Sequence, residues 1–104
     1  MYEYEMKRKT WRAVDGDTID CDIDLGFKIT HRIRGRLAGV DTPERGDAKF
    51  KEATEALECL MLAAEKKEGP LIVQTKKTGK FGRWIIHLPD GINERMAEHW
   101  PYKK

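Results

Sequence analysis

Strict alternation of hydrophobic and polar residues marks the segment from residue 18 to residue 25. Its apolar positions are Ile19, Cys21, Ile23 and Leu25. Because successive side chains of a strand point to opposite faces, this period predicts a strand with one buried face. Residues 10–14 predict a preceding strand, and the Asp15-Gly16-Asp17 motif predicts the turn between the two. Residues 28–38 predict a third strand, so the chain opens with a three-stranded meander.

The hydrophobic period changes after Asp47. From there, apolar residues recur at intervals of three and four, at Phe50, Ala53, Leu57, Leu60, Met61 and Ala64. This spacing is typical of one buried face of an α-helix. Asp47 is a suitable N-cap, and Gly69 followed by Pro70 would end the helix. A long helix is therefore predicted between these two points.

Two more strands and a short helix complete the predicted pattern. The strands cover residues 71–77 and 83–88, and the helix covers residues 92–100. Three strands, a helix and two strands are the element order of an OB-fold, a small Greek-key barrel. We therefore predict an α+β, mainly β fold: a five-stranded OB-fold barrel with one long helix after strand 3 and a short C-terminal helix. The length predicts a single domain, residues 1–104.

Composition narrows the class of protein without indicating an activity. Charged residues make up 37% of the chain and hydrophobic residues 39%, which fits a globular protein with a heavily charged surface. The net charge of +2 is too small to indicate a nucleic-acid-binding protein by itself. No apolar stretch could cross a bilayer, and the first residues lack the apolar core of a signal peptide, which predicts a cytoplasmic protein without a membrane partner. A secreted protein whose leader has been removed would show the same pattern. Cys21 and Cys59 lack CxxC spacing and are predicted to be buried free thiols.

Residue types capable of chemistry gather in three short segments at predicted strand ends and loops, where binding residues collect. These segments are residues 15–18, 36–44 and 80–83. If the fold brings Asp17 and Asp41 together, their charges repel by about 4 kcal/mol at a separation of about 4 Å and an effective dielectric constant of about 20. A hard cation would hold them there, and the available carboxylate, carbonyl and hydroxyl oxygens suit calcium or magnesium.

Phosphodiester cleavage needs two parts besides the cation. A carboxylate must position or deprotonate the attacking water, and fixed guanidinium groups must hold the charge of the transition state. The chain offers Glu44 for the first task and Arg36 with Arg83 for the second. Arginine suits this role because its planar fork meets two phosphate oxygens at once.

Each segment also has a purely structural explanation. Asp-Gly-Asp is a common turn, residues 41–44 could form only a loop that leads into a helix, and residues 79–83 could form a plain hairpin loop. A further set of charges predicts an exposed cross-strand ladder with no catalytic role. Its members are Asp20, Asp22, Asp24, Arg32 and Arg34. The structural explanations account for each segment singly and poorly for their joint occurrence.

Together the segments resemble the staphylococcal nuclease (thermonuclease) family. The resemblance rests on Val-Asp-Gly-Asp-Thr at 14–18, Arg-Leu-Ala-Gly-Val-Asp-Thr-Pro-Glu at 36–44 and Lys-Phe-Gly-Arg at 80–83, with Ile-Asn-Glu at 92–94 opening the last helix. It runs from residue 9 to residue 100 in the family's order. It implies an SNase-like OB-fold barrel with an active site on one rim, which cleaves DNA and RNA at the bond to the 5′ oxygen and leaves 3′-phosphates.

The resemblance also implies a calcium site. Asp17 and Asp41 would bind Ca²⁺ through their carboxylates, and Thr42 would bind it through its backbone carbonyl. Asp15 would lie close behind these ligands without touching the ion.

Catalytic and nucleotide-binding roles follow in the same way. Glu44 would act as general base, Arg36 would contact the scissile phosphate, and Arg83 would stabilise the transition state. The residues that would bind the nucleotide are Lys80, Phe81 and Tyr102.

Two departures from the family pattern affect substrate binding more than chemistry. Phe81 stands where the family has a tyrosine, so a hydroxyl is lost while a ring remains for stacking. The chain also stops soon after the short helix, without the family's long C-terminal helix. We expect weaker substrate binding, lower stability, and a monomer or a weak homo-oligomer.

The leading hypothesis is a calcium-dependent nuclease that acts on single-stranded or melted DNA and on RNA. The main alternative is a catalytically inactive OB-fold module that only binds nucleic acid. Such a module would be expected to lose the acidic cluster or an arginine, because buried like charges without a metal destabilise a protein. A structural or inhibitory protein whose charge ladder packs against a partner is a third hypothesis, and it leaves the loop motifs unexplained.

Overall fold

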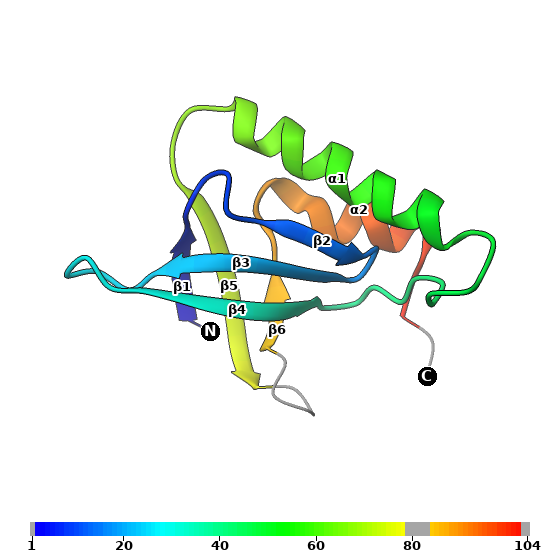
Figure 1. The fold of residues 1–104 in the computed structure, drawn as a ribbon, viewed down its shortest axis with the longest axis horizontal. Coiled ribbons are helices and arrows are strands. Elements are labelled where there is room, and N and C mark those ends of the chain that lie inside the picture. The colour runs from blue at the N-terminus through cyan, green and yellow to red at the C-terminus, as the bar shows by residue number, and fades with distance from the viewer. Residues whose placement is uncertain (1, 79–83, 103–104) are drawn as a thin grey trace.

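The computed structural model, which describes residues 2–78 and 84–102, contains a β-barrel with two helices (Figure 1). The strands are β1 (Tyr2–Met6), β2 (Arg12–Asp15), β3 (Thr18–Asp24), β4 (Thr30–Leu37), β5 (Leu71–Thr78) and β6 (Trp84–His87). The helices are α1 (Phe50–Lys66) and α2 (Ile92–His99), the second preceded by a 3₁₀ turn at Pro89–Gly91. The predicted α+β, mainly β class is confirmed.

Five strands close the barrel. Around the ring the order is β1-β5-β6-β4-β3, and β3 pairs back with β1. Each pairing in the ring is antiparallel except that of β4 with β6, which is parallel. β2 pairs with the first half of β3, along the same edge whose second half pairs with β1. The ring is the mixed five-stranded barrel that the OB-fold prediction required, with α1 between strands β4 and β5 of the chain.

The first strand differs from the prediction. The strand expected at residues 10–14 is present as β2, but a strand that was not expected, β1, precedes it, with Lys9 between them at a φ of 63°. Residues 2–6, Tyr-Glu-Tyr-Glu-Met, alternate as a strand does, but the segment is short and was not assigned; four of its residues are exposed, and Met6 alone is buried. Yet β1 is the strand that joins β5 to β3 and thereby closes the ring.

The core fills the space between the barrel and α1. The predicted helical stripe is confirmed where α1 buries Ala53, Leu57, Met61 and Ala64. The helix lies across β2 and packs against α2, so both helices cover one end of the barrel (Figure 1). Gly35 is required within this core because a Cβ there would overlap the side chain of Ile86, where β4 and β6 run side by side.

The ends of α1 are held by groups that the sequence did not indicate. Asp47 is not the N-cap: the cap is Lys49, whose backbone N–H donates to Asp47 Oδ1 at 2.8 Å, so the carboxylate closes a turn before the helix. At the other end, the guanidinium of Arg8 donates to the carbonyl oxygen of Lys67 at 2.7 Å. Its other two acceptors are the carbonyl oxygens of Glu65 and Gly69.

The predicted charge ladder is present on the outer face of β3 and β4. Arg34 pairs with Asp20 at 2.8 Å and Arg32 with Asp22 at 2.9 Å, both in an exposed setting. Asp24 is not part of it, because its partner across the sheet is Thr30. Exposed pairs of this kind contribute little, about 0–1 kcal/mol each.

The two cysteines differ from each other. Cys21 is buried, as predicted, and burial raises the pKa of its thiol to about 12. Cys59 is exposed on α1, so the prediction of a second buried thiol is wrong. Cys59 lies on the helix face that points away from the buried residues of α1.

None of the helices in residues 2–78 and 84–102 has both the length and the apolar composition that crossing a bilayer needs.

Candidate active site

A glycine lets the turn between β2 and β3 lie against the start of α1. A Cβ at Gly16 would fall 2.7 Å from the Cβ of Ala53 and 2.7 Å from Cγ2 of Thr42. Only a residue without a side chain fits there. This close approach places the next residue, Asp17, beside the loop that follows β4, which carries Asp41 and Thr42.

Asp17 is almost fully buried and is held by three hydrogen bonds. Its Oδ1 accepts from the hydroxyl of Thr18 at 3.0 Å, and its Oδ2 accepts from the backbone N–H of Thr42 at 3.3 Å. Its own N–H donates to Oδ1 of Asp15 at 3.0 Å. The carboxylate is thus fixed in orientation by residues from two separate segments of the chain.

Asp15 and Asp17 titrate in opposite directions. Burial raises the pKa of Asp15 to about 6, with further increases from its side-chain hydrogen bond to Asp17 and from the Asp17 charge. Burial also raises the pKa of Asp17, but hydrogen bonds from Asp15, Thr42 and Thr18 and the charge of Arg36 together lower it below its ordinary value. When this pair holds one proton, the proton therefore resides on Asp15, and Asp17 stays ionised.

Arg36 lies between the two predicted calcium carboxylates. It stands opposite Thr18 in the pairing of β3 with β4. Its Nη2 is 3.6 Å from Oδ2 of Asp17 and 3.7 Å from Oδ1 of Asp41. Both distances exceed the roughly 2.7–2.9 Å of a charge-assisted hydrogen bond. The guanidinium therefore balances both charges while keeping donors for a further anion.

The segment after α2 brings an aromatic ring to Arg36. Val40 and Pro101 form a β-bridge, the N–H of Asp41 donates to the carbonyl of Trp100 at 3.0 Å, and the N–H of Tyr102 donates to the carbonyl of Gly39 at 3.1 Å. The half-exposed ring of Tyr102 then lies with its centre 5.7 Å from Cζ of Arg36. Tyr102, predicted to bind the nucleotide, thus borders the acidic cluster.

A buried asparagine that the sequence analysis gave no role fixes this loop from behind. Asn93 donates to the carbonyl oxygens of Ala38 and Ile86, both at 3.0 Å, and its Oδ1 accepts from the N–H of Leu88 at 2.8 Å. It therefore fastens the loop after β4 to β6 and α2. The Ile-Asn-Glu motif had marked this position, but only the fold shows its contacts.

The oxygen atoms around Asp17 fit a hard cation in kind. Asp17 and Asp41 converge on one positive group, and Oγ1 of Thr42 is buried without a hydrogen-bond partner in the described part of the chain. Carboxylate, hydroxyl and carbonyl oxygens are the ligands that Ca²⁺ takes in proteins. Within the same part of the chain, no three His, Cys, Asp or Glu side chains are grouped to hold a metal, so an ion here would also need backbone, water or substrate oxygens.

The remaining predicted residues are not joined to this cluster by described contacts. Glu44 has an exposed side chain, and no hydrogen bond or ion pair of the described residues links it to Asp17, Asp41 or Arg36. Lys80, Phe81 and Arg83 lie outside the described residues. The structure therefore brings together Asp15, Asp17, Arg36, Asp41, Thr42 and Tyr102 and leaves the other four predictions untested.

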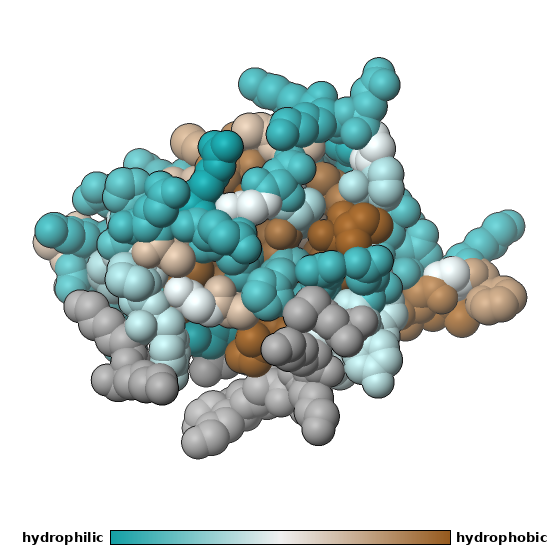
Figure 2. Space-filling model, turned by 180° about the vertical axis from the view of Figure 1, so that it is seen from behind, coloured by the Kyte–Doolittle hydropathy of each residue, from teal (hydrophilic) through white to brown (hydrophobic). Residues whose placement is uncertain are grey.

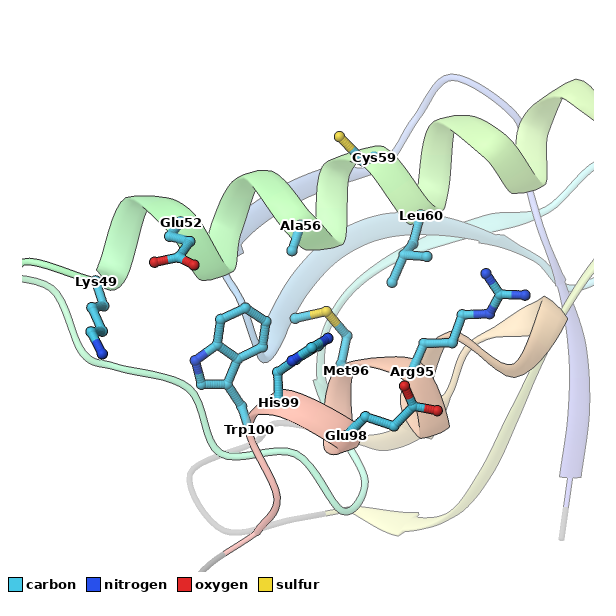
Figure 3. A pocket seen from close by; sticks show the side chains of 10 residues that line it. All are labelled: Lys49, Glu52, Ala56, Cys59, Leu60, Arg95, Met96, Glu98, His99 and Trp100. Atoms are coloured by element: carbon cyan, nitrogen blue, oxygen red, sulfur yellow. The ribbon is translucent and has the colours of Figure 1, made fainter.

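A separate hollow of about 860 Å³ lies between the two helices (Figure 3). Its walls include Glu52, Ala56 and Leu60 of α1 on one side and Arg95, His99 and Trp100 on the other. None of the predicted site residues lines it. The hollow is therefore separate from the acidic cluster.

Comparison with known proteins finds a similarity to a curated protein but no family assignment. No family model matches the chain. Over 97 residues the chain is 28% identical to Protein ParB of Escherichia coli, and the match covers 93% of this chain and 48% of ParB. The chain thus spans about half the length of this curated relative.

Proposed function

We propose that the chain is a calcium-dependent nuclease of the staphylococcal nuclease type, which hydrolyses phosphodiester bonds of DNA and RNA at the 5′ P–O bond and leaves 3′-phosphates. The observation that carries this proposal is the position of Arg36 between Asp17 and Asp41, at 3.6 and 3.7 Å. Two segments of sequence, 15–18 and 36–44, contribute to this arrangement, and a phosphodiesterase needs those groups close together.

Arg36 binds the phosphate in this proposal. A guanidinium between two carboxylates has a fixed position. Its N–H groups that make no short hydrogen bond to the carboxylates can donate to two phosphate oxygens. Bound at Asp17 and Asp41, with Thr42 nearby, calcium would supply Lewis-acid polarisation of the phosphoryl oxygen. Because its pKa is lowered, Asp17 is ionised at neutral pH and can bind a cation. Asp15 helps to hold it in place by accepting a hydrogen bond from the backbone N–H of Asp17.

Tyr102 supplies a contact to the nucleotide itself. Its ring is half exposed and lies beside Arg36, so a base or sugar next to the bound phosphate can stack on it. Stacking needs an unpaired base, and we therefore propose single-stranded or melted DNA and RNA as substrates. Glu44 as the base that activates water, Arg83 as the group that stabilises the transition state, and Lys80 and Phe81 as nucleotide contacts complete the proposal on the resemblance of the sequence.

Cleavage of denatured DNA and of RNA by the purified chain tests the proposal. We expect 3′-phosphorylated products with calcium present and none after excess chelator. The Asp41→Asn variant should lose this activity, whereas Asp22→Asn, which changes a carboxylate of the exposed ladder, should retain it. Full activity in chelator, or equal loss in both variants, would contradict the proposal.

Calcium should also stabilise the folded protein, since a ligand that binds only the native state adds about 2.7 kcal/mol at a hundred times its dissociation constant. The thermal unfolding midpoint is expected to rise with calcium in the wild type and to stay constant in Asp41→Asn. Binding of single-stranded DNA without cleavage, and without this shift, would favour the inactive nucleic-acid-binding module.

A further inference from the structure

Two arginines between residues 36 and 50 each lie over an aromatic ring. Cζ of Arg36 lies 5.7 Å from the centre of the Tyr102 ring, and Cζ of Arg45 lies 5.8 Å from the centre of the Phe50 ring. A ring attracts a cation over its face at such distances, so it restricts the movement of a long side chain. The first pair belongs to the candidate site, whereas the second has no part in the proposed function.

Two turns of backbone fix the second pair close to the candidate site. The N–H of Asp47 donates to the carbonyl of Glu44 at 3.0 Å, and the N–H of Phe50 donates to the carbonyl of Asp47 at 3.1 Å. On the other side, the N–H of Thr42 is bonded to the acidic cluster. Three residues of chain, which span at most about 11 Å, lead from Thr42 to Arg45. The backbone of Arg45 therefore lies next to the candidate site.

The side chain of Arg45 is available to an anion. It is exposed, and no ion pair of the described residues involves it. By contrast, Arg32 and Arg34 pair with carboxylates of the charge ladder, and Arg8 donates to carbonyl oxygens at the end of α1. The planar fork of Arg45 can therefore donate to two phosphate oxygens at once.

The surroundings of Arg45 are polar. The loop at 44–49 is exposed throughout and also carries Lys49. Of its two acidic residues, Glu44 is the proposed general base, and Asp47 accepts the N–H of Lys49 at 2.8 Å. The loop lies at the end of the molecule opposite to the hairpin between β3 and β4 (Figure 1), and Figure 2 shows mostly hydrophilic residues at that end, on the left of the view. Such a surface suits the charged backbone of a nucleic acid.

We propose that Arg45 binds a phosphate of the substrate strand next to the scissile phosphate, and that Phe50 holds its guanidinium in position. An OB-fold contacts about 4–16 nucleotides of a single strand, whereas the candidate site accounts for one phosphate, at Arg36, and one base, at Tyr102. The neighbouring nucleotides therefore need contacts outside the acidic cluster. This inference rests on the proposed function, because it adds a second subsite for the same substrate.

A contact outside the reacting phosphate has a distinct kinetic signature. Arg45 strengthens the binding of substrate and transition state alike, so its loss raises KM and leaves kcat unchanged. Arg45→Ala should therefore raise KM for denatured DNA at least about fivefold without a change in kcat. It should leave both constants unchanged for a nitrophenyl ester of a single nucleotide, whose one phosphodiester occupies Arg36 and does not reach Arg45.

Binding without cleavage measures the contact directly. In excess chelator, the purified chain should bind a labelled single-stranded oligonucleotide of about 16 nucleotides. Each phosphate contact contributes about 0.7 to the slope of log K against log salt, so Arg45→Ala should reduce this slope by about 0.7 and the affinity at low salt at least about fivefold. Arg95→Ala is the matched control, because it removes an exposed arginine that lines the hollow between the helices (Figure 3). It should leave the slope unchanged.

Phe50→Leu tests the positioning of Arg45. Leucine keeps an apolar side chain at the start of α1 and removes the ring face, so the affinity for the oligonucleotide should fall part of the way toward that of Arg45→Ala. Combined with Arg45→Ala, it should cause no further loss, since the ring acts only through the guanidinium. Thermal unfolding of each variant shows that the fold is retained. A further loss in the double variant would overturn the role of Phe50.

The outcomes separate this inference from the proposed nuclease activity. Calcium-dependent cleavage with an unchanged slope in Arg45→Ala, or with an equal change in Arg95→Ala, overturns the second subsite alone. A reduced slope in Arg45→Ala without any cleavage by the wild type supports the phosphate contact and contradicts the nuclease. Failure of the wild type to bind the oligonucleotide also overturns the second subsite.

Discussion

At the residue scale, the candidate site depends on one guanidinium shared by two carboxylates. Arg36 neutralises Asp17 and Asp41 without forming a short hydrogen bond to either. A carboxylate removed from such a group leaves the others with an unbalanced charge. The same residue is thus both the countercharge of the folded protein and the proposed contact to phosphate.

Arg36→Ala is expected to lower nuclease turnover by about 10²–10³-fold, the effect of removing one preorganised group that stabilises charge. Single-turnover cleavage of denatured DNA at saturating calcium measures it. Arg34→Ala is the matched control, because Arg34 lies two residues earlier on the same strand face, is itself exposed, and pairs with Asp20 of the charge ladder. A loss below tenfold in Arg36→Ala would remove Arg36 from the mechanism.

Asp15→Asn should change how stability depends on pH. Asp15 has a pKa of about 6 in the folded protein against an ordinary value of 3.8, so the folded state binds more protons between these values. The contribution of Asp15 to stability therefore falls as pH rises through this window. The new amide cannot ionise and can still hydrogen bond to Asp17, so the variant should be the more stable protein above pH 6.

Chemical denaturation in chelator, followed from below pH 3.8 to above pH 6, measures this difference. The advantage of the variant should shrink as pH falls through the window, because Asp15 of the wild type then takes up its proton. The lowered pKa of Asp17 acts in the opposite direction, and its contribution is lost only below 3.8. A difference that does not vary with pH would contradict the assigned proton.

Residue types and spacing predicted the charged residues of the candidate site, but not the residues that hold them in place. The motifs identified Asp17, Arg36 and Asp41, because chemistry restricts which side chains can bind a cation or a phosphate. The roles of Gly16 and Asn93 were not predictable, since each depends on a contact with segments far away in sequence. A glycine in a turn and an asparagine at a helix start have many common explanations.

At the element scale, the middle of α1 followed from the sequence and its ends did not. The helical stripe was visible because core packing requires an apolar residue at every third or fourth position. The ends depend on hydrogen bonds to single groups. Asp47 was predicted to be the N-cap, whereas its carboxylate accepts a hydrogen bond from the N–H of the actual N-cap, Lys49. Arg8 lies more than fifty residues from the carbonyl oxygens it serves, so no local pattern could reveal it.

Arg8→Met is expected to reduce the free energy of unfolding by about 1–2 kcal/mol. The variant keeps an apolar stem but leaves the last carbonyl oxygens of α1 without their charged donor. Denaturant titration followed by far-ultraviolet circular dichroism measures the change. Lys7→Met, which removes the neighbouring exposed charge, should shift stability by less than about 0.5 kcal/mol. Equal effects of both substitutions would show that the loss of a positive charge, and not the loss of the hydrogen bonds from Arg8, lowers the stability.

At the scale of the whole molecule, the barrel is closed by a strand that is mostly exposed to solvent. β1 exposes four of its five residues, and Met6 is the one that enters the core. Without β1, one edge of β5 and the end of β3 at residues 23–24 would be left unpaired. The overall fold was predictable because the order of elements allowed few alternatives, whereas the role of β1 depends on pairing with β5, almost seventy residues away in sequence.

Met6→Ala should lower the free energy of unfolding by about 2–5 kcal/mol, since it opens a cavity at the point of closure. Glu5→Ala, next to it and exposed, should change stability by less than about 0.5 kcal/mol. Thermal and denaturant unfolding of both variants provide the comparison. A small effect of Met6→Ala would mean that the ring closes without this side chain.

Because β1 pairs with β5 and β4 pairs with β6, the ring cannot be completed until the last strand has been synthesised. While the chain is still attached to the ribosome, the first three-quarters of it can form the meander and α1 but must wait with strand edges exposed. Contacts between such distant segments slow folding and favour aggregation in the interval. Production of this protein should therefore respond to translation speed and to chaperones that shield nascent chains.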